Sequence, residues 1–140
     1  MIFNSQSEKE TEKFAENFAK TLIPGDVVAL FGEMGAGKTA FVRGFLRGFS
    51  FEGEVSSPTF AIVHEYHGGI LPVFHFDMYR VESWDDLYST AFFEYIDMGG
   101  ISVIEWSENI ENALPENSKR ILIEKTGENQ RKITYTEEKK

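Results

Sequence analysis

The amino-acid sequence predicts an α/β fold in three layers, in which helices flank both faces of a mixed central β-sheet. Short apolar runs of strand length alternate with longer stretches in which apolar residues recur every three to four positions. Val27–Phe31 and Ile101–Ile104 are such runs, as expected for strands buried on both faces. With 140 residues, the chain suits one domain, which we expect to span residues 1–140.

The first helix is expected to begin at Ser7. The Ser7 hydroxyl can cap the helix while the Glu10 carboxylate reaches back in a capping box. Phe14, Phe18 and Leu22 follow at four-residue intervals and form one apolar stripe. The stripe predicts that the helix packs on the sheet through one face.

A second helix is expected to begin at Lys38. Its apolar residues have helical spacing and predict one broad packed face; they are Phe41, Val42, Phe45, Leu46 and Phe49. Gly44 and Gly48 fall on the same helix, where a glycine costs about 1 kcal/mol relative to alanine. We therefore expect either a close backbone approach at these glycines or an early helix end.

The rest of the chain is expected to add strands and short helices. His67-Gly68-Gly69 predicts a turn between two antiparallel strands, and the second strand delivers Asp77 at its end. The expected elements are extended segments 59–63 and 70–76, helical pieces within 83–96, strand 101–104, a short helix after Trp106, and strands 120–124 and 132–135. The polar loop at residues 51–57 is a candidate switch.

Eight residues between the first strand and the second helix form a phosphate-binding motif; they are Gly32, Glu33, Met34, Gly35, Ala36, Gly37, Lys38 and Thr39. Backbone N–H groups from Met34 to Thr39 are expected to surround the phosphates, because glycine permits a close approach. Lys38 is expected to hold the β- and γ-phosphates, and Thr39 to offer its hydroxyl to magnesium.

The position of this motif indicates what it binds. An apolar strand before the loop and an amphipathic helix after it are the structural context that a phosphate loop requires. The helix directs the positive end of its dipole at the anion. The sequence therefore predicts a P-loop NTPase-like domain that binds a purine nucleoside triphosphate with Mg²⁺. We take ATP over GTP because the Asn/Thr-Lys-x-Asp guanine motif does not occur.

Two carboxylates at expected strand ends are candidates for chemistry at the metal. Glu105 follows Ile101–Ile104, and Asp77 follows the strand that ends at Phe76. Open α/β sheets bind ligands at the carboxyl ends of their strands, and a P-loop hydrolase needs a carboxylate near its magnesium. We favour Glu105 for magnesium. Asp77 is either a second metal contact or the group that orients the attacking water.

Other polar residues carry weaker signals. Thr59 follows Ser57-Pro58 and is either a switch threonine that senses the γ-phosphate or a hydroxyl at the start of a strand. Trp106 lines the site or belongs to the core. The three histidines, His64, His67 and His75, lack the spacing of a metal-binding cluster. Of these, His64 and His75 are expected to pack on strands.

The composition excludes several classes of function. Fourteen basic and 23 acidic side chains give a net charge of −9 without a basic cluster, so strong direct binding of tRNA is not expected. The absence of cysteine excludes disulfides and thiol chemistry. No apolar run approaches the roughly 20 residues of a membrane span, and the N-terminus does not look like a secretory signal. We expect a cytoplasmic protein without membrane binding.

Four motifs together resemble those of the TsaE family of bacterial ATPases. They are the phosphate loop at 32–39, Ser57-Pro58-Thr59, the segment 75–80 and Ile104-Glu105-Trp106. Their order and spacing are also similar, and the resemblance covers nearly the whole chain. It implies a role in forming the threonylcarbamoyl modification of adenosine 37 in tRNA. It also implies TsaD and TsaB as partners, with ATP hydrolysis supporting repeated turnover of their transferase complex.

The resemblance implies roles for individual residues as well. Thr39 and Glu105 correspond to magnesium positions, and Asp77 corresponds to an essential acidic residue. Contacts with the adenine base are implied at Glu8, Thr11 and Arg131.

Two other functions stay open at this point. Small-molecule kinases use the same loop, although 140 residues leave little room for an acceptor pocket and a lid. A nucleotide-dependent switch is the other alternative, with hydrolysis only resetting the loop at 50–59. Arg43 and Arg80 are the internal candidates for stabilising the transition state. Neither is assured of reaching it, so we expect slow hydrolysis that a partner accelerates.

Overall fold

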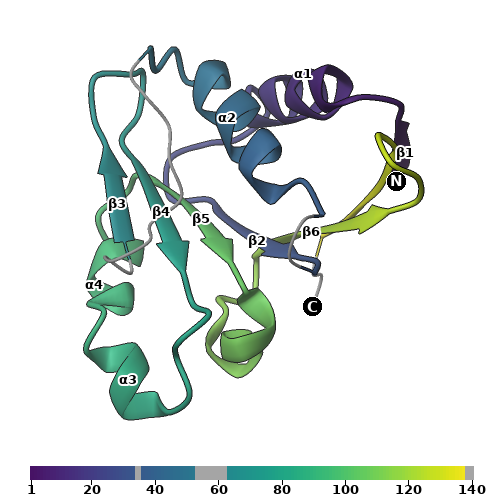
Figure 1. Cartoon of the computed structure of the whole chain (residues 1–140). Coiled ribbons are helices and arrows are strands. Elements are labelled where there is room, and N and C mark those ends of the chain that lie inside the picture. Colours follow the sequence, from purple (N-terminus) through teal and green to yellow (C-terminus); the bar gives the residue numbers. More distant parts are fainter. Residues whose placement is uncertain (34–35, 53–62, 138–140) are drawn as a thin grey trace.

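The computed structural model describes residues 1–33, 36–52 and 63–137, and these form a seven-stranded sheet with helices on both faces (Figure 1). The three-layer α/β prediction is confirmed. The elements are β1 (Ile2–Ser5), α1 (Glu8–Ala19), β2 (Val27–Phe31), α2 (Lys38–Gly48), β3 (Val63–Tyr66), β4 (Val73–Asp77), α3 (Trp84–Tyr88), α4 (Phe92–Ile96), β5 (Ile101–Glu105), the 3₁₀ helix η1 (Ser107–Ala113), β6 (Lys119–Lys125) and β7 (Arg131–Glu137).

The sheet is parallel in its centre and antiparallel toward its edges, in the order β1-β7-β6-β2-β5-β4-β3. β2 runs parallel to β5 and β6, and β5 runs parallel to β4. β3 pairs antiparallel with β4, so the predicted hairpin is confirmed for the described residues 63–77. Every residue of β5 is buried, as the apolar run predicted.

The edge strand β1 was not expected from the sequence. It has four residues and pairs antiparallel with β7, which lies at the other end of the chain. The pairing places Phe3 opposite Ile133. Such a contact is set by long-range register, which a local pattern cannot show.

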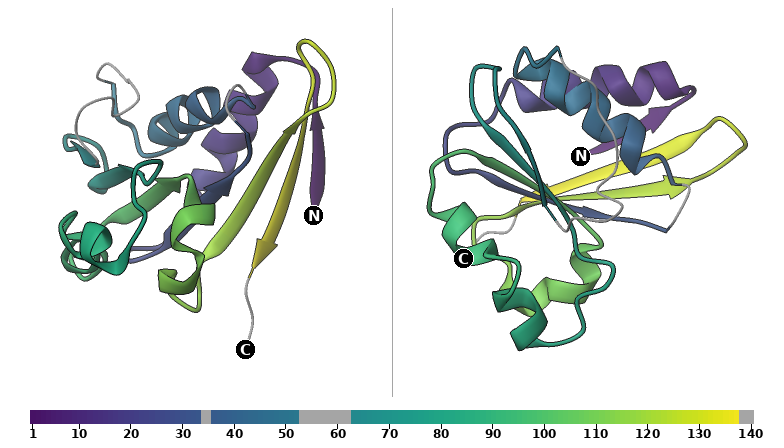
Figure 2. Two further views of the ribbon diagram at one scale, coloured as in Figure 1. Left: turned by 60° about the horizontal axis from the view of Figure 1, so that its bottom comes forward. Right: turned by 60° about the vertical axis from the view of Figure 1, so that its left-hand side comes forward.

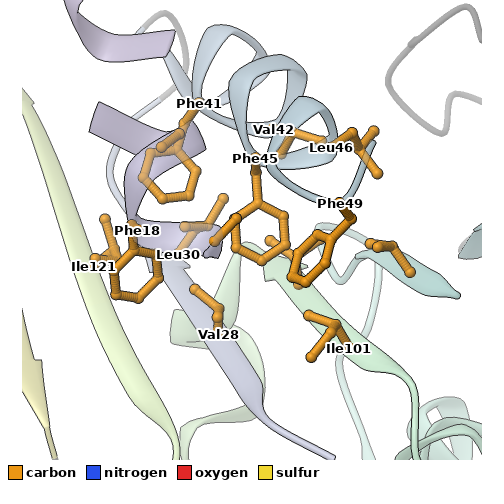
Figure 3. Packing of buried hydrophobic residues seen from close by; sticks show 14 of the residues in the cluster. Phe18, Val28, Leu30, Phe41, Val42, Phe45, Leu46, Phe49, Ile101 and Ile121 are labelled. Atoms are coloured by element: carbon orange, nitrogen blue, oxygen red, sulfur yellow. The ribbon is translucent and has the colours of Figure 1, made fainter. Parts of the chain in front are cut away.

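The helices divide between the two faces of the sheet (Figure 2). α1 and α2 cover one face, where Val28, Leu30 and Ile121 point into a large apolar cluster with Phe41 and Phe45 (Figure 3). α3, α4 and η1 cover the other face. A second cluster fills that side; it includes Phe74, Phe76, Leu87, Phe92, Ile104 and Ile110.

α1 begins where the sequence predicted, with one difference in its cap. The Ser7 hydroxyl accepts a hydrogen bond from the backbone N–H of Glu10 at 3.1 Å. The Glu10 carboxylate accepts from the N–H of Gln6 at 3.0 Å rather than from that of Ser7. The reciprocal bond therefore lies one residue earlier than in a capping box.

The two glycines of α2 lie where α2 closely approaches α1. Of the two expectations, a close backbone approach and an early helix end, the first is therefore correct. A Cβ on Gly44 would overlap the backbone of Glu12, and a Cβ on Gly48 would lie 2.6 Å from the carbonyl oxygen of Glu16. α2 continues to Gly48, so neither glycine ends the helix early. Within the described ranges, no helix is long and apolar enough to span a membrane.

Candidate functional site

The described part of the phosphate loop needs glycine at two positions. Gly32 has φ +143° and Gly37 has φ +103°, a backbone region that side chains rarely adopt. A Cβ on Gly32 would also lie 2.5 Å from the carbonyl oxygen of Ile123 on β6. Met34 and Gly35 lie outside the described residues. The loop is therefore fixed against the sheet at its first residue, and it turns into α2 through a left-handed glycine.

Lys38 and Thr39 begin α2 directly after this turn. Lys38 is 6% exposed, and its Nζ donates a hydrogen bond to the carbonyl oxygen of Gly32 at 2.8 Å. The same Nζ lies 4.2 Å from the centroid of the Trp106 ring. Thr39 is exposed on the first turn. The first turn of a helix has backbone N–H groups without helical partners, so this end of α2 suits an anion.

Asp77 and Glu105 lie side by side at the carboxyl ends of β4 and β5. The two residues are direct partners in the parallel register. Asp77 Oδ1 accepts a hydrogen bond from the N–H of Tyr79 at 3.0 Å, and the carbonyl oxygen of Glu105 accepts one from the N–H of Met78 at 3.1 Å. The two carboxylates therefore lie at one edge of the sheet, as predicted from their positions at the ends of strands.

His75 contacts Glu105, which the sequence interpretation missed. Its Nε2 lies 2.5 Å from Glu105 Oε2, and both side chains are buried. His75 precedes Asp77 by two residues on β4, so the two side chains share a face of the sheet. That spacing was visible in the sequence, but the contact depends on how β4 and β5 are aligned.

A cavity of about 420 Å³ joins the predicted site residues. Those that line it are Glu8, Thr11, Gly37, Lys38, Thr39, Asp77, Glu105 and Arg131. Five more residues line it; they are Ala40, Arg43, Trp106, Glu128 and Asn129. Glu33 and Ala36 belong to the loop but do not line this cavity. Thr59 lies outside the described residues.

The cavity extends across the end of β2, because β4 and β5 lie on one side of β2 and β6 and β7 on the other. The carboxylates therefore occupy one end, and the residues implied for the adenine base occupy the other. There, Arg131 Nε donates to the carbonyl oxygen of Ala36 at 2.9 Å. Thr11 shares a 2.7 Å hydrogen bond with Ser5. Arg131 thus holds the β6–β7 turn against the phosphate loop.

The two arginines considered for the transition state differ in their surroundings. Arg43 lines the cavity, but its Nη1 donates to Glu8 at 2.8 Å and to Glu12 at 3.2 Å. The hydrogen bond with Glu8 is the main cause that raises the pKa of Arg43. Arg80 is exposed and does not line this cavity. Arg43 is therefore held by two glutamates, and Arg80 lies outside the cavity.

η1 supports both loops of the site, which the sequence did not indicate. The Glu108 carboxylate accepts a hydrogen bond from the N–H of Gly32 at 3.2 Å. Asn109 Nδ2 donates to the carbonyl oxygens of Met78 at 2.9 Å and Tyr79 at 3.1 Å. One short helix therefore fixes the start of the phosphate loop and the segment after Asp77.

The donor set fits magnesium only together with phosphate. Among the described residues, no group of three or more His, Cys, Asp and Glu side chains is arranged to hold a metal ion. The cavity does offer two carboxylates and the Thr39 hydroxyl. Mg²⁺ is typically held by one or two carboxylates together with substrate phosphates and water. The residues present are therefore compatible with a magnesium–nucleotide complex and do not form an independent metal cage.

These features define the class of protein as a P-loop-like α/β domain, with a glycine-rich loop between a central parallel strand and a helix. The family model described as "Threonylcarbamoyl adenosine biosynthesis protein TsaE" matches residues 5–133. The chain belongs to the TsaE family.

Individual relatives agree with this assignment. The chain is 41% identical over 133 residues to "tRNA threonylcarbamoyladenosine biosynthesis protein TsaE" of Bacillus subtilis, covering 95% of this chain and 81% of the relative. It is 35% identical to the protein of the same name in Treponema pallidum, covering 93% and 96%. The crystal structure of Bacillus subtilis YdiB superimposes with a TM-score of 0.81 at 34% identity, covering 99% of this chain and 86% of that one.

Proposed function

We propose that this chain binds ATP with Mg²⁺ and hydrolyses it slowly, as a step in forming the threonylcarbamoyl modification of tRNA in the cytoplasm. We further propose that a complex of TsaB and TsaD accelerates this hydrolysis. The observation that carries the proposal is the single cavity shared by Lys38, Thr39, Asp77 and Glu105. Membership of a family named for threonylcarbamoyladenosine biosynthesis supports the biological role.

The phosphate side of the cavity is suited to hold and orient a triphosphate. The first turn of α2 directs N–H groups at the anion, and Lys38 supplies a buried positive charge beside it. Trp106 and the Gly32 carbonyl oxygen keep this ammonium at the loop. Thr11 and Arg131, at the other end of the cavity, would contact the adenine base. The nucleotide would therefore extend from the carboxylates toward the β6–β7 turn.

The carboxylate side would hold the metal and the attacking water. Thr39 and Glu105 would be the residues nearest the metal. Magnesium, when bound, would neutralise charge on the transferred phosphoryl group. Asp77 would either add a metal contact or orient the water, and the Asp77→Asn variant separates the two roles. A weakened Mg²⁺ affinity would indicate a metal contact, whereas loss of turnover at unchanged Mg²⁺ affinity would indicate water positioning.

The arginines support slow hydrolysis by the chain alone. Arg43 is held by two glutamates, and Arg80 is exposed outside the cavity. A partner that supplies an arginine or orders a loop increases hydrolysis by about 10³-fold or more in comparable systems. We therefore expect a large stimulation by the partner complex.

The experiment is an ATPase assay of the purified chain with Mg²⁺, alone and with the TsaB–TsaD complex. A panel of small hydroxyl acceptors tests for a kinase, and Lys38→Ala is the control. Stimulation by the complex that Lys38→Ala abolishes would support the proposal. Phosphorylation of an acceptor without stimulation would replace it with a kinase. The Glu105→Gln variant should bind ATP and fail to turn it over. If that variant still supports tRNA modification, hydrolysis is not obligatory and the nucleotide acts as a switch.

A further inference from the structure

We infer that His75 is a positioning residue, which fixes the Glu105 carboxylate for the metal and so sets the affinity for the magnesium–nucleotide complex. The inference rests on the proposed function and adds a residue to the proposed site. Its basis is the contact between His75 Nε2 and Glu105 Oε2 at 2.5 Å, deep in the sheet.

The surroundings of His75 are unusual for a histidine. It is 1% exposed on β4, where its neighbours in sequence are Phe74 and Phe76. It lies opposite Val103 on β5, and the ring of Tyr66 is 6.4 Å away. An apolar side chain would suit this position better, because burying a polar ring requires hydrogen bonds in compensation.

The hydrogen-bonding pattern of the ring points toward Glu105. The hydrogen bond joins the ring atom Nε2 to Glu105 Oε2, and a Glu105 carboxylate that holds a metal would accept it, since an ionised carboxylate only accepts hydrogen bonds. Among the described residues, the buried Nδ1 atom has no hydrogen-bond partner. The ring therefore satisfies one of its two nitrogens, and that nitrogen bonds a candidate metal ligand.

The bond constrains a side chain that otherwise has few restraints. Glu105 lines the cavity, and the described residues give its carboxylate no hydrogen bond besides the one from His75. Asp77, its partner in the register, is instead held by the N–H of Tyr79. Residues that orient a metal ligand from behind typically change metal affinity by about 10- to 100-fold when removed. His75 would act through Glu105 in this way and would not contact the metal or the nucleotide.

The test measures Mg²⁺ affinity apart from turnover. The His75→Leu variant removes the donor and fills the same apolar surroundings, and His75→Gln keeps an N–H near the position of Nε2. Each is titrated with Mn²⁺ by electron paramagnetic resonance in the presence of a non-hydrolysable ATP analogue. His64→Leu is the matched control, because His64 lies directly opposite His75 in the β3–β4 pair and does not line the cavity.

We expect His75→Leu to weaken Mn²⁺ binding about 10-fold or more, with the melting temperature unchanged or raised. His75→Gln should recover most of the affinity, and His64→Leu should match the wild type. In a Glu105→Gln background, His75→Leu should add less than about a twofold change, because the two residues act as one unit.

Two results would overturn the inference. One is wild-type Mn²⁺ affinity in a folded His75→Leu variant; the other is an equal loss with and without the Glu105 carboxylate. If the wild type itself binds no metal–nucleotide complex, the proposed function fails and the role of His75 fails with it. Should His75→Leu not fold, His75→Gln decides: wild-type affinity supports the inference, and a 10-fold loss in a variant that retains the N–H contradicts it.

Discussion

The two faces of the sheet differ in the length of the helices that cover them and in what those helices do. The face that carries the cavity is covered by α1 and α2, with 12 and 11 residues, and these two helices pack so closely that Gly44 and Gly48 are required. The opposite face is covered by α3 and α4, with five residues each, and by η1. There, Trp84 and Tyr88 are 54% and 62% exposed.

The difference follows from the tasks of the two sides. A phosphate loop needs a rigid helix whose first turn stays in place, and the long α1–α2 pair provides one. On the other face, the short helix η1 supports loops of the site through Glu108 and Asn109.

Phe45→Ala and Phe92→Ala compare the two cores directly. Both rings are fully buried, Phe45 on α2 and Phe92 on α4. Each variant is expected to lose about 3–5 kcal/mol in free energy of unfolding, measured in urea. Only Phe45→Ala should also weaken nucleotide binding at low temperature, since Phe45 supports the helix of the phosphate loop. A larger loss of binding in Phe92→Ala would contradict the assigned roles of the faces.

Gly44→Ala tests the close approach of α1 and α2. The added Cβ would overlap backbone atoms of Glu12. Backbone atoms cannot move aside as easily as the end of a flexible side chain can. We expect a loss of about 2 kcal/mol in free energy of unfolding, after the gain of about 1 kcal/mol in helix propensity. Asn17→Ala, at an exposed position of α1, is the control and should not destabilise the protein. An equally stable Gly44→Ala variant would show that the helices can separate without cost.

Arg47→Met tests the ion pairs that join the same two helices. Arg47 Nη1 contacts Glu12 at 2.6 Å and Arg47 Nε contacts Glu16 at 3.4 Å, with the Arg47 side chain 46% exposed. Because solvent screens such pairs, the loss in free energy of unfolding should be below about 1 kcal/mol. The difference from the wild type should shrink in 1 M salt, where the Debye length falls to about 3 Å. Lys9→Met, on the exposed surface of α1, is the control.

Tyr95→Phe tests a contact of α4 and is expected to have the smallest effect. Tyr95 Oη donates to Glu65 at 2.7 Å, and this bond is the main cause that lowers the pKa of Glu65 below 4.5. A lowered folded-state pKa stabilises the fold above the unfolded pKa, and this contribution disappears as pH falls through the folded value. In Tyr95→Phe, an NMR titration should find the pKa of Glu65 shifted upward. Tyr95→Phe and the wild type should become equally stable at low pH, and an unshifted pKa would contradict the assignment.

Local sequence patterns predicted those helices and strands whose own residues show which of their faces are buried. The apolar runs of β2 and β5 and the helical spacing of Phe41 and Phe45 were sufficient, because burial on one or both faces leaves a periodic signal. The placement of Asp77 and Glu105 followed from a rule about strand ends. The phosphate loop before Lys38 was also predicted from local sequence, because the strand before it and the helix after it are its neighbours in the chain.

Features that depend on register were not predictable. β1 exists because it pairs with β7 across the length of the chain. The contact of His75 with Glu105 requires β4 and β5 to be aligned residue by residue. The hydrogen bonds of Glu108 and Asn109 likewise depend on where η1 lies after Trp106, whose backbone is left-handed with φ +58°. A single sequence carries no direct record of such pairings.

A crystal structure of this chain with Mg²⁺ and a non-hydrolysable ATP analogue would show directly whether the cavity holds the nucleotide. We predict the triphosphate at the first turn of α2, with Lys38 at the β- and γ-phosphates, and the metal beside Thr39 and Glu105. The adenine base should lie near Thr11 and Arg131. Phosphates bound outside this cavity, or a metal that contacts neither Thr39 nor Glu105, would contradict this prediction.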